Sequence, residues 1–219
     1  MKTVLSLAAG LLLTTSASAQ APRVGIEAGV NFSNTTFRYD SPFSGDEREQ
    51  GDSRLGAKAG IVLDFRLTRG FYFQPGLFYS QKGSDEFLND PRQEIRINYV
   101  ELPFNFLFKA GTGATGRFFA GGGPYIGIAT GGEYDYGGDE EDLEIGNDRG
   151  DVISRLDAGL NVTAGYEFPG GIYIRGNAAF GLANVFSDDV TDYYNAIGLD
   201  DAVLRNDSYS LTLGYFIGR

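Results

Sequence analysis

Most of the chain alternates between apolar and polar positions with a period of two. In Asn98–Gly111 ("NYVELPFNFLFKAG"), apolar side chains at positions 100, 102, 104, 106 and 108 alternate with Tyr99, Glu101 and Asn105. Successive side chains of a strand point to opposite faces, so this pattern predicts a strand with one apolar and one polar face. Eight segments of this kind follow one another: residues 24–32, 54–66, 71–83, 98–111, 117–130, 153–168, 172–185 and 208–219.

The connections between these segments alternate in length. Long connections span residues 38–53, 84–93, 131–151 and 185–207, and short ones span 67–70, 110–116 and 169–171. A meander with all long loops at one end and all tight turns at the other is typical of outer-membrane barrels. The pattern therefore predicts an all-β fold, an eight-stranded antiparallel up-and-down transmembrane β-barrel.

Alternation alone does not say which face lies inside. A soluble barrel would bury the apolar face, whereas a membrane barrel turns it towards lipid. The polar face here is rich in Gly, Ser, Asn and Thr and carries charges of both signs, which favours a narrow, ion-paired interior in a membrane barrel. The candidates for interior ion pairs are Glu27, Lys58, Asp64, Lys82, Glu101, Arg155, Asp157, Glu167 and Arg175.

Three prolines interrupt the predicted strands. Pro75, Pro103 and Pro124 cannot donate a hydrogen bond to a neighbouring strand, and prolines in sheets concentrate at edges and bulges. We therefore expect local β-bulges at these positions.

Several of the segments together resemble a known family. The motifs "VGIEAGVNFSN", "GLFYSQKG", "NYVELPFNFLFK", "FFAGGGPYIG" and "LTLGY" are similar to those of PorT-type outer membrane β-barrel proteins, often labelled porin family proteins. The resemblance runs from about Val24 to the end of the chain, and "NYVELP" followed by "GGGPYIG" is its most specific part. It implies an eight-stranded barrel in the outer membrane, and it implies no catalytic residues.

The first residues predict a separate targeting segment. Lys2 precedes an apolar run over residues 4–13, and Ala17-Ser18-Ala19 supplies a small-residue cleavage pattern. This is the layout of a secretory signal peptide, and the apolar run is shorter than the roughly 20 residues that a membrane-spanning helix needs. We expect a signal peptide at 1–19 and a barrel domain at 20–219, with the mature protein in the bacterial outer membrane.

Composition removes several function classes. The net charge is −11, which leaves no basic surface for nucleic acid. The chain contains no His and no Cys, so catalytic triads and ordinary zinc sites are excluded, and we expect neither an enzyme nor a cofactor. Eight strands also leave an interior that side chains fill, so a general diffusion channel is not expected.

The acidic residues concentrate in the long connections. Of 29 Asp and Glu residues, 23 lie there, against five Arg. The simplest interpretation is a solvated, mobile acidic surface. An alternative hypothesis is Ca²⁺ binding in residues 131–151, because Ca²⁺ takes six to eight oxygen ligands, although the spacing does not match an EF-hand loop. The candidate ligands are Asp139, Glu140, Glu141, Asp142 and Asp148.

These observations favour a small outer-membrane barrel, acting as a monomer, with a structural or interaction role. Its expected partners are the membrane lipid, lipopolysaccharide and a protein of the envelope or of a secretion system. The alternative is a narrow porin-like channel or a transport accessory protein.

Overall fold

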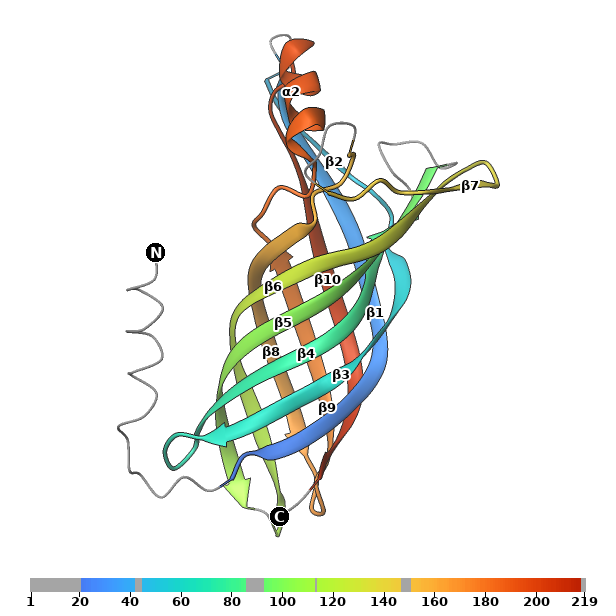
Figure 1. Cartoon of the computed structure of the whole chain (residues 1–219). Coiled ribbons are helices and arrows are strands. Elements are labelled where there is room, and N and C mark those ends of the chain that lie inside the picture. The colour runs from blue at the N-terminus through green and yellow to red at the C-terminus, as the bar shows by residue number, and fades with distance from the viewer. Residues whose placement is uncertain (1–20, 42–44, 86–92, 113, 147–150, 218–219) are drawn as a thin grey trace, which may run out of the picture.

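The computed structural model describes residues 21–41, 45–85, 93–112, 114–146 and 151–217. The predicted signal peptide lies outside these residues. Eight strands form a ring: β1 (Arg23–Ser41), β3 (Arg54–Arg66), β4 (Phe71–Ser84), β5 (Gln93–Thr112), β6 (Gly116–Tyr136), β8 (Leu156–Glu167), β9 (Ile172–Gly181) and β10 (Asp200–Ile217). Two short strands and a helix extend one end: β2 (Gly45–Gln50), β7 (Asp139–Asp142) and α2 (Asp188–Ala196) (Figure 1).

Each strand of the ring pairs antiparallel with the next one, and the first strand pairs with the last. β1 and β10 run together from Val24↔Ile217 to Arg38↔Val203, which closes the sheet. Closure satisfies the backbone groups that an open sheet edge would leave unpaired. The prediction of an eight-stranded antiparallel up-and-down barrel is therefore confirmed. We call the end that carries β2, β7 and α2 the loop end, and the opposite end the turn end (Figure 1).

The middle of the barrel carries its apolar side chains outwards. In β5, Phe106 and Phe108 are exposed, whereas Glu101, Asn105 and Lys109 are buried inside. β10 repeats this arrangement over residues 208–217. The exposed apolar positions run from Val24 to Phe32 along β1 and from Ile172 to Leu182 at β9, which matches the roughly 9–11 tilted residues that cross a bilayer. This is the orientation predicted for a membrane barrel and the reverse of that in a soluble one.

Aromatic side chains gather on the outside near the turn end. Phe71 and Phe108 pack with ring centroids 5.3 Å apart, and Tyr166 packs against Phe118 at 4.6 Å and against Phe168 at 4.9 Å. Phe118 is 70% exposed in the absence of lipid. Aromatic residues prefer the boundary between lipid tails and headgroups. This group therefore marks one edge of the band of outward-facing apolar side chains around the barrel, which we call the apolar belt.

At the loop end the two faces of the strands exchange their character. Ile95 and Ile97 of β5 and Leu204 of β10 point inwards and are buried, while Arg96 and Arg205 lie on the outward face. The alternation itself does not change here, because buried and less buried positions still alternate along this region of β10. What changes is the residue type on each face: apolar residues point inwards and polar residues point outwards. The loop end is therefore built like a water-soluble protein, with an apolar interior and a polar surface, and the strands rise beyond the belt.

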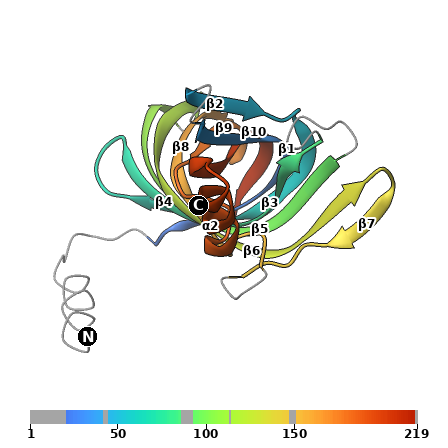
Figure 2. The same ribbon diagram turned by 90° about the horizontal axis from the view of Figure 1, so that it is seen from above.

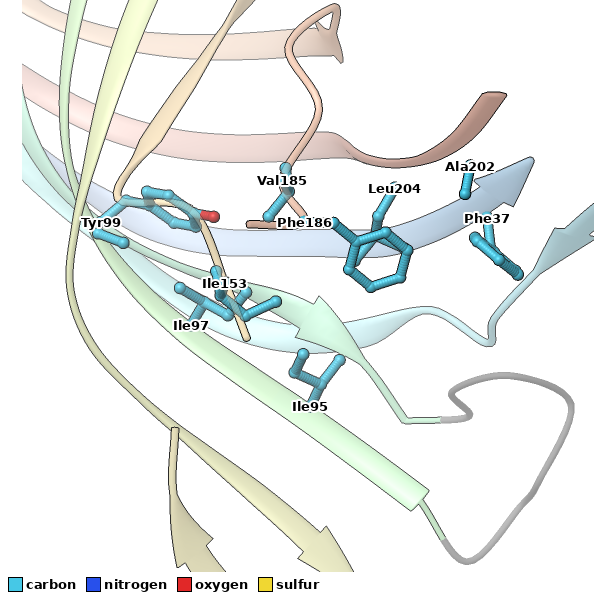
Figure 3. Packing of buried hydrophobic residues seen from close by; sticks show 10 residues of the cluster. Phe37, Ile95, Ile97, Tyr99, Ile153, Val185, Phe186, Ala202 and Leu204 are labelled. Carbon is cyan, nitrogen blue, oxygen red and sulfur yellow. The ribbon is translucent and has the colours of Figure 1, made fainter. Parts of the chain in front are cut away.

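An apolar cluster fills the barrel at this level. It joins side chains from the strands to residues of the connections before β8 and after β9, as Figure 3 shows. The members are Phe37, Ile95, Ile97, Tyr99, Ala129, Ile153, Val185, Phe186, Ala202 and Leu204. Tyr194 of α2 packs on Phe37 and Phe186, with ring centroids 5.2 and 5.6 Å away. We call this group the apolar cap; seen from above, α2 lies over the ring (Figure 2).

The long connections contain more regular structure than the sequence predicted. β1 and β2 form a hairpin within 38–53, and β6 continues to Tyr136 before β7 returns alongside it. α2 begins at Ser187, whose hydroxyl accepts a hydrogen bond from the Val190 amide, and Asp188 and Asp189 occupy its first turn. The helix was missed because it is short, and its packing comes from residues distant in sequence.

The expected bulges at the three prolines are not present. The registers of β4, β5, β6 and β8 are the same before and after Pro75, Pro103 and Pro124. Pairing is interrupted next to Pro75 and Pro103, so the missing donor removes local hydrogen bonds without inserting a residue. Strand pairing on both sides of each proline holds the register. The registers shift instead at Asn98/Tyr99 and at Arg38/Asp40.

In the part of the chain that the structure describes, no helix has the length and apolar character needed to cross a membrane.

Candidate functional site in the barrel interior

The centre of the barrel holds a linked set of buried charges. Lys82 of β4 donates to Glu101 at 2.6 Å and to Asp157 at 3.0 Å, and Lys58 of β3 donates to Glu101 at 2.9 Å. The side chains of Lys82 and Asp157 are completely buried. Buried charges persist only when paired and hydrogen-bonded, and here two cations face two carboxylates. Tyr125 adds a longer contact to Asp157 at 3.4 Å.

A second set of charges closes the turn end. Asp64 accepts from Arg23 at 2.6 Å and from Lys109 at 2.8 Å. Glu167 accepts from Arg23 at 2.7 Å and from Arg117 at 2.5 Å. These residues come from five strands, so the set ties the wall together around the opening.

Aromatic rings lie among these charges. Phe216 is buried and packs on Tyr173, with ring centroids 4.6 Å apart. The central carbon of the Arg23 guanidinium lies 4.2 Å from the centroid of the Phe216 ring. Lys109 lies 4.9 Å from the same ring. Cations over aromatic faces gain electrostatic attraction that is stronger away from water, so the turn end is filled as well as ion-paired.

Glu27 lies between the central charges and those of the turn end, opposite Gly60 of β3, with Lys58 and Asp64 on either side. It accepts a hydrogen bond from Tyr173 at 2.7 Å and one from Thr212 at 3.2 Å, and Arg175 lies 3.4 Å away. Arg175 also donates to Gln74. A cavity of about 20 Å³ beside Glu27 and Arg175 has room for about one water molecule.

The structure brings most of the predicted interior residues together. Glu27, Lys58, Asp64, Lys82, Glu101, Asp157, Glu167 and Arg175 all lie inside the barrel and face partners of opposite charge. Arg155 does not belong to this set: it is exposed and donates to the backbone oxygen of Ile145 in the loop region. It precedes β8 at the loop end, where the chain has not yet entered the membrane-level part of the wall, and its side chain lies in the loop region and not in the interior.

Three of the interior cations were not among those predicted from the sequence. Lys109 lies on the same face of β5 as Glu101 and Asn105, and the alternation could have identified it. Arg23 is the first residue of β1 and Arg117 is the second residue of β6, and the ends of strands are the part that a sequence pattern predicts least well.

The proposed Ca²⁺ ligands do not converge. Asp139, Glu140, Glu141 and Asp142 form β7, and all four are exposed. Successive side chains of a strand point to opposite faces, so these four cannot surround one ion. Within the described residues no group of three or more acidic side chains is placed to hold a metal ion, and Asp148 lies outside them.

Solved structures of outer-membrane proteins are similar to this chain at the level of the fold. Neisserial surface protein A is 11% identical, with a TM-score of 0.46, covering 89% of this chain and 97% of its own. The attachment invasion locus protein Ail of Yersinia pestis is 12% identical, with a TM-score of 0.35, covering 88% and 99%. The outer membrane enzyme PagL is 16% identical, with a TM-score of 0.47, covering 84% and 99%. A search of curated proteins finds no match to the chain.

The family of the chain is shown by a match of its sequence to a family model. Residues 18–187, well over half of the chain, match the family described as "Outer membrane protein beta-barrel domain". The match covers β1 to β9, and its description agrees with the closed ring and the outward apolar belt. The loop end is therefore the outer end and the turn end the periplasmic end. The chain belongs to the outer membrane protein β-barrel domain family, and its place is the bacterial outer membrane.

Proposed function

We propose that this protein is a non-enzymatic outer-membrane barrel of the PorT type, which anchors a folded acidic surface outside the membrane for interaction with another component of the envelope. The observation that carries the proposal is the contrast between its two parts. The membrane-level interior is closed by ion pairs, whereas the outer end is a folded structure that displays charge.

The filled interior supports a role other than transport. Lys82 bridges Glu101 and Asp157 at mid-height, the Arg23 and Lys109 pairs fill the periplasmic end, and the apolar cap fills the outer end. A solute would have to break several of these contacts to pass. The narrow-channel alternative would need a large rearrangement of buried charges, which is costly.

The chemistry of the interior also favours a protein without catalytic activity. The chain has no His and no Cys to serve as base or nucleophile. Its buried carboxylates Glu101 and Asp157 are both bound by Lys82 and are therefore occupied by structural ion pairs. A carboxylate pair for hydrolysis needs room for a substrate, and the cavity of about 20 Å³ beside Glu101 has room only for about one water molecule.

The outer end provides the surface for interaction. The hairpin of β6 and β7 projects sideways from the ring (Figures 1 and 2), and its tip is the Gly137-Gly138 turn, in which both residues have positive φ. The Gly138 amide donates to Asp135 at 2.7 Å, which holds the turn. All four residues of β7 are acidic and exposed. A partner that fits this hairpin carries a basic surface.

Two experiments test the proposal. Planar-bilayer recordings of the pure protein should show no stable conductance, and large stable conductance would favour the channel alternative. In pull-downs from envelope extracts, the wild type should retain a partner that the variant D139N/E140Q/E141Q/D142N loses. A control variant that neutralises two charges at the periplasmic end, R66Q/R69Q, should behave as the wild type. Equal capture by all three proteins would contradict a role for the hairpin.

A further inference from the structure

We propose that a group of three arginines on the outward face of β1, β2 and β10 binds the phosphate of a lipid headgroup in the outer leaflet. The surface consists of Arg38, Arg48 and Arg205, with Asn34 and Thr36 between them and the apolar belt. It is separate from the acidic hairpin, and the inference does not depend on the role proposed above.

The number of arginines on this face is unusual for this chain. The four long connections contain 23 acidic residues and only five arginines, with no lysine. Three of these five arginines lie on this one face. Arg38 stands directly opposite Arg48 in the β1–β2 pairing, and Thr36 stands opposite Arg205 in the β1–β10 pairing. Like charges placed opposite each other in a sheet repel, so the face is stabilised when an anion lies between them.

The direction of this face follows from burial. Phe37 and Leu204, the neighbours of Arg38 and Arg205 in sequence, are buried in the apolar cap inside the barrel. Because side chains alternate along a strand, Arg38 and Arg205 lie on the outside. Arg48, opposite Arg38 and exposed, shares that outer face.

The three arginines differ in their partners from other arginines near the loop end. Within the described residues, Arg38, Arg48 and Arg205 form no ion pair, although other surface arginines such as Arg54 and Arg96 do. Asp40 and Asp46 form the next pair on the same face, and Asp207 lies two residues from Arg205 and accepts a hydrogen bond from the Gly181 amide. The face therefore carries acids as well as arginines, but no ion pair joins these acids to Arg38, Arg48 or Arg205 in the part of the chain that the structure describes, so the guanidinium groups can still receive an anion.

Buried polar atoms without partners point to a ligand at the same place. The Nε atom of Arg205, the side-chain oxygen of Asn34 and the hydroxyl of Thr36 are all buried and have no hydrogen-bond partner. Thr36 and Asn34 are 3% and 9% exposed. Buried polar groups are nearly always hydrogen-bonded, so a ligand that both accepts from arginine and donates to oxygen fits this position. A phosphate with adjacent hydroxyl groups has both properties.

The height of the surface selects lipid as the source of the phosphate. Phe32 and Tyr209, paired in register, are exposed and end the apolar belt on these two strands. Arg205 lies four residues from Tyr209 on the same face, about 13 Å along the tilted strand, and its long side chain can reach down to the headgroup layer. A phosphate held there would have its acyl chains beside Phe32 and Tyr209.

The test uses the purified full-length protein in detergent micelles that contain equal amounts of phosphatidic acid and phosphatidylcholine. Native mass spectrometry then counts the lipids that each protein retains. We expect the wild type to retain phosphatidic acid over phosphatidylcholine by roughly tenfold, because arginine–phosphate contacts are charge-assisted and often bidentate. The variant R38Q/R48Q/R205Q should retain the two lipids about equally.

The control variant R66Q/R69Q/R155Q removes the same charge from exposed arginines elsewhere and should keep the wild-type preference. Heat-modifiable gel migration checks that each variant is folded, and the single reversal R48E on the short strand β2 replaces the triple variant if that one fails to fold. Equal loss in the control and the triple variant would overturn the inference, as would an unchanged preference in the triple variant. Displacement of the lipid by millimolar inorganic phosphate would assign the site to free phosphate and overturn the lipid as its ligand.

Discussion

The ammonium group of Lys82 lies 3.0 Å from the carboxylate of Asp157, and neither side chain is reached by solvent. Seventy-five residues separate them in the chain, and they face each other across the barrel from β4 and β8. Such a contact forms only after the ring has closed, so it reports on the assembled interior.

Replacing Lys82 with Met should destabilise the barrel. Asp157 would lose its cation and remain as an unpaired buried charge, at a cost of about 3–5 kcal/mol in the free energy of unfolding. The measurement is the urea concentration at which half of the protein in lipid vesicles is unfolded, determined from the different gel mobilities of the folded and unfolded barrel. The double variant K82M/D157N removes both charges and should recover part of the loss. A K82M midpoint equal to that of the wild type would show that the contact contributes nothing to stability.

Gly214→Ala should perturb the interior beneath Tyr173. A Cβ at position 214 would lie 2.2 Å from Cζ of Tyr173, so the ring must move and its hydrogen bond to Glu27 would weaken. We expect a loss of about 1–3 kcal/mol. Gly176→Ala is the control, because the nearest atom to its added Cβ is 3.9 Å away. Similar urea midpoints for the two variants would contradict the crowding at Gly214.

Single cysteines in β5 should locate the outer edge of the membrane. The natural chain has no Cys, so each introduced thiol is labelled alone. In lipid vesicles, a water-soluble maleimide should label Arg96→Cys and leave Phe106→Cys unlabelled, because Phe106 lies in the apolar belt and Arg96 lies beyond it. Both should react after unfolding in urea. Fast labelling at position 106 in vesicles would show that this position does not lie in the apolar belt.

Leu204→Ala should loosen the apolar cap without opening the barrel below it. Leu204 is fully buried in the cap, and its truncation should cost about 2–5 kcal/mol locally. Chymotrypsin should then cut after Tyr193 in α2 at least about tenfold faster, while heat-modifiable migration of the membrane part persists. Val203→Ala, on the outward face of the same strand, is the control. Equal cleavage rates in the two variants would show that the stability of α2 does not depend on the apolar cap.

The sequence by itself determined the facing of the strands at membrane level. Alternation places Phe106 and Phe108 on one side of β5 and Glu101 and Asn105 on the other whatever lies beside the strand, because the period of two belongs to the backbone. The alternation of long and short connections likewise determined the number and direction of the strands. From these the barrel and most of its inward-facing charges could be predicted.

The tertiary structure decided which charges meet. Lys82 reaches Asp157, and Arg23 reaches both Asp64 and Glu167, because of strand registers and the closure of the ring, which no single segment encodes. It also decided that the strands continue past the membrane and fold into the apolar cap, since the inward face there is apolar only where distant residues such as Phe186 and Tyr194 cover it. The prediction that Arg155 lies in the interior was wrong for the same reason. A local pattern predicts the face of a strand on which a side chain lies, whereas the position of that side chain along the barrel axis depends on the tertiary structure.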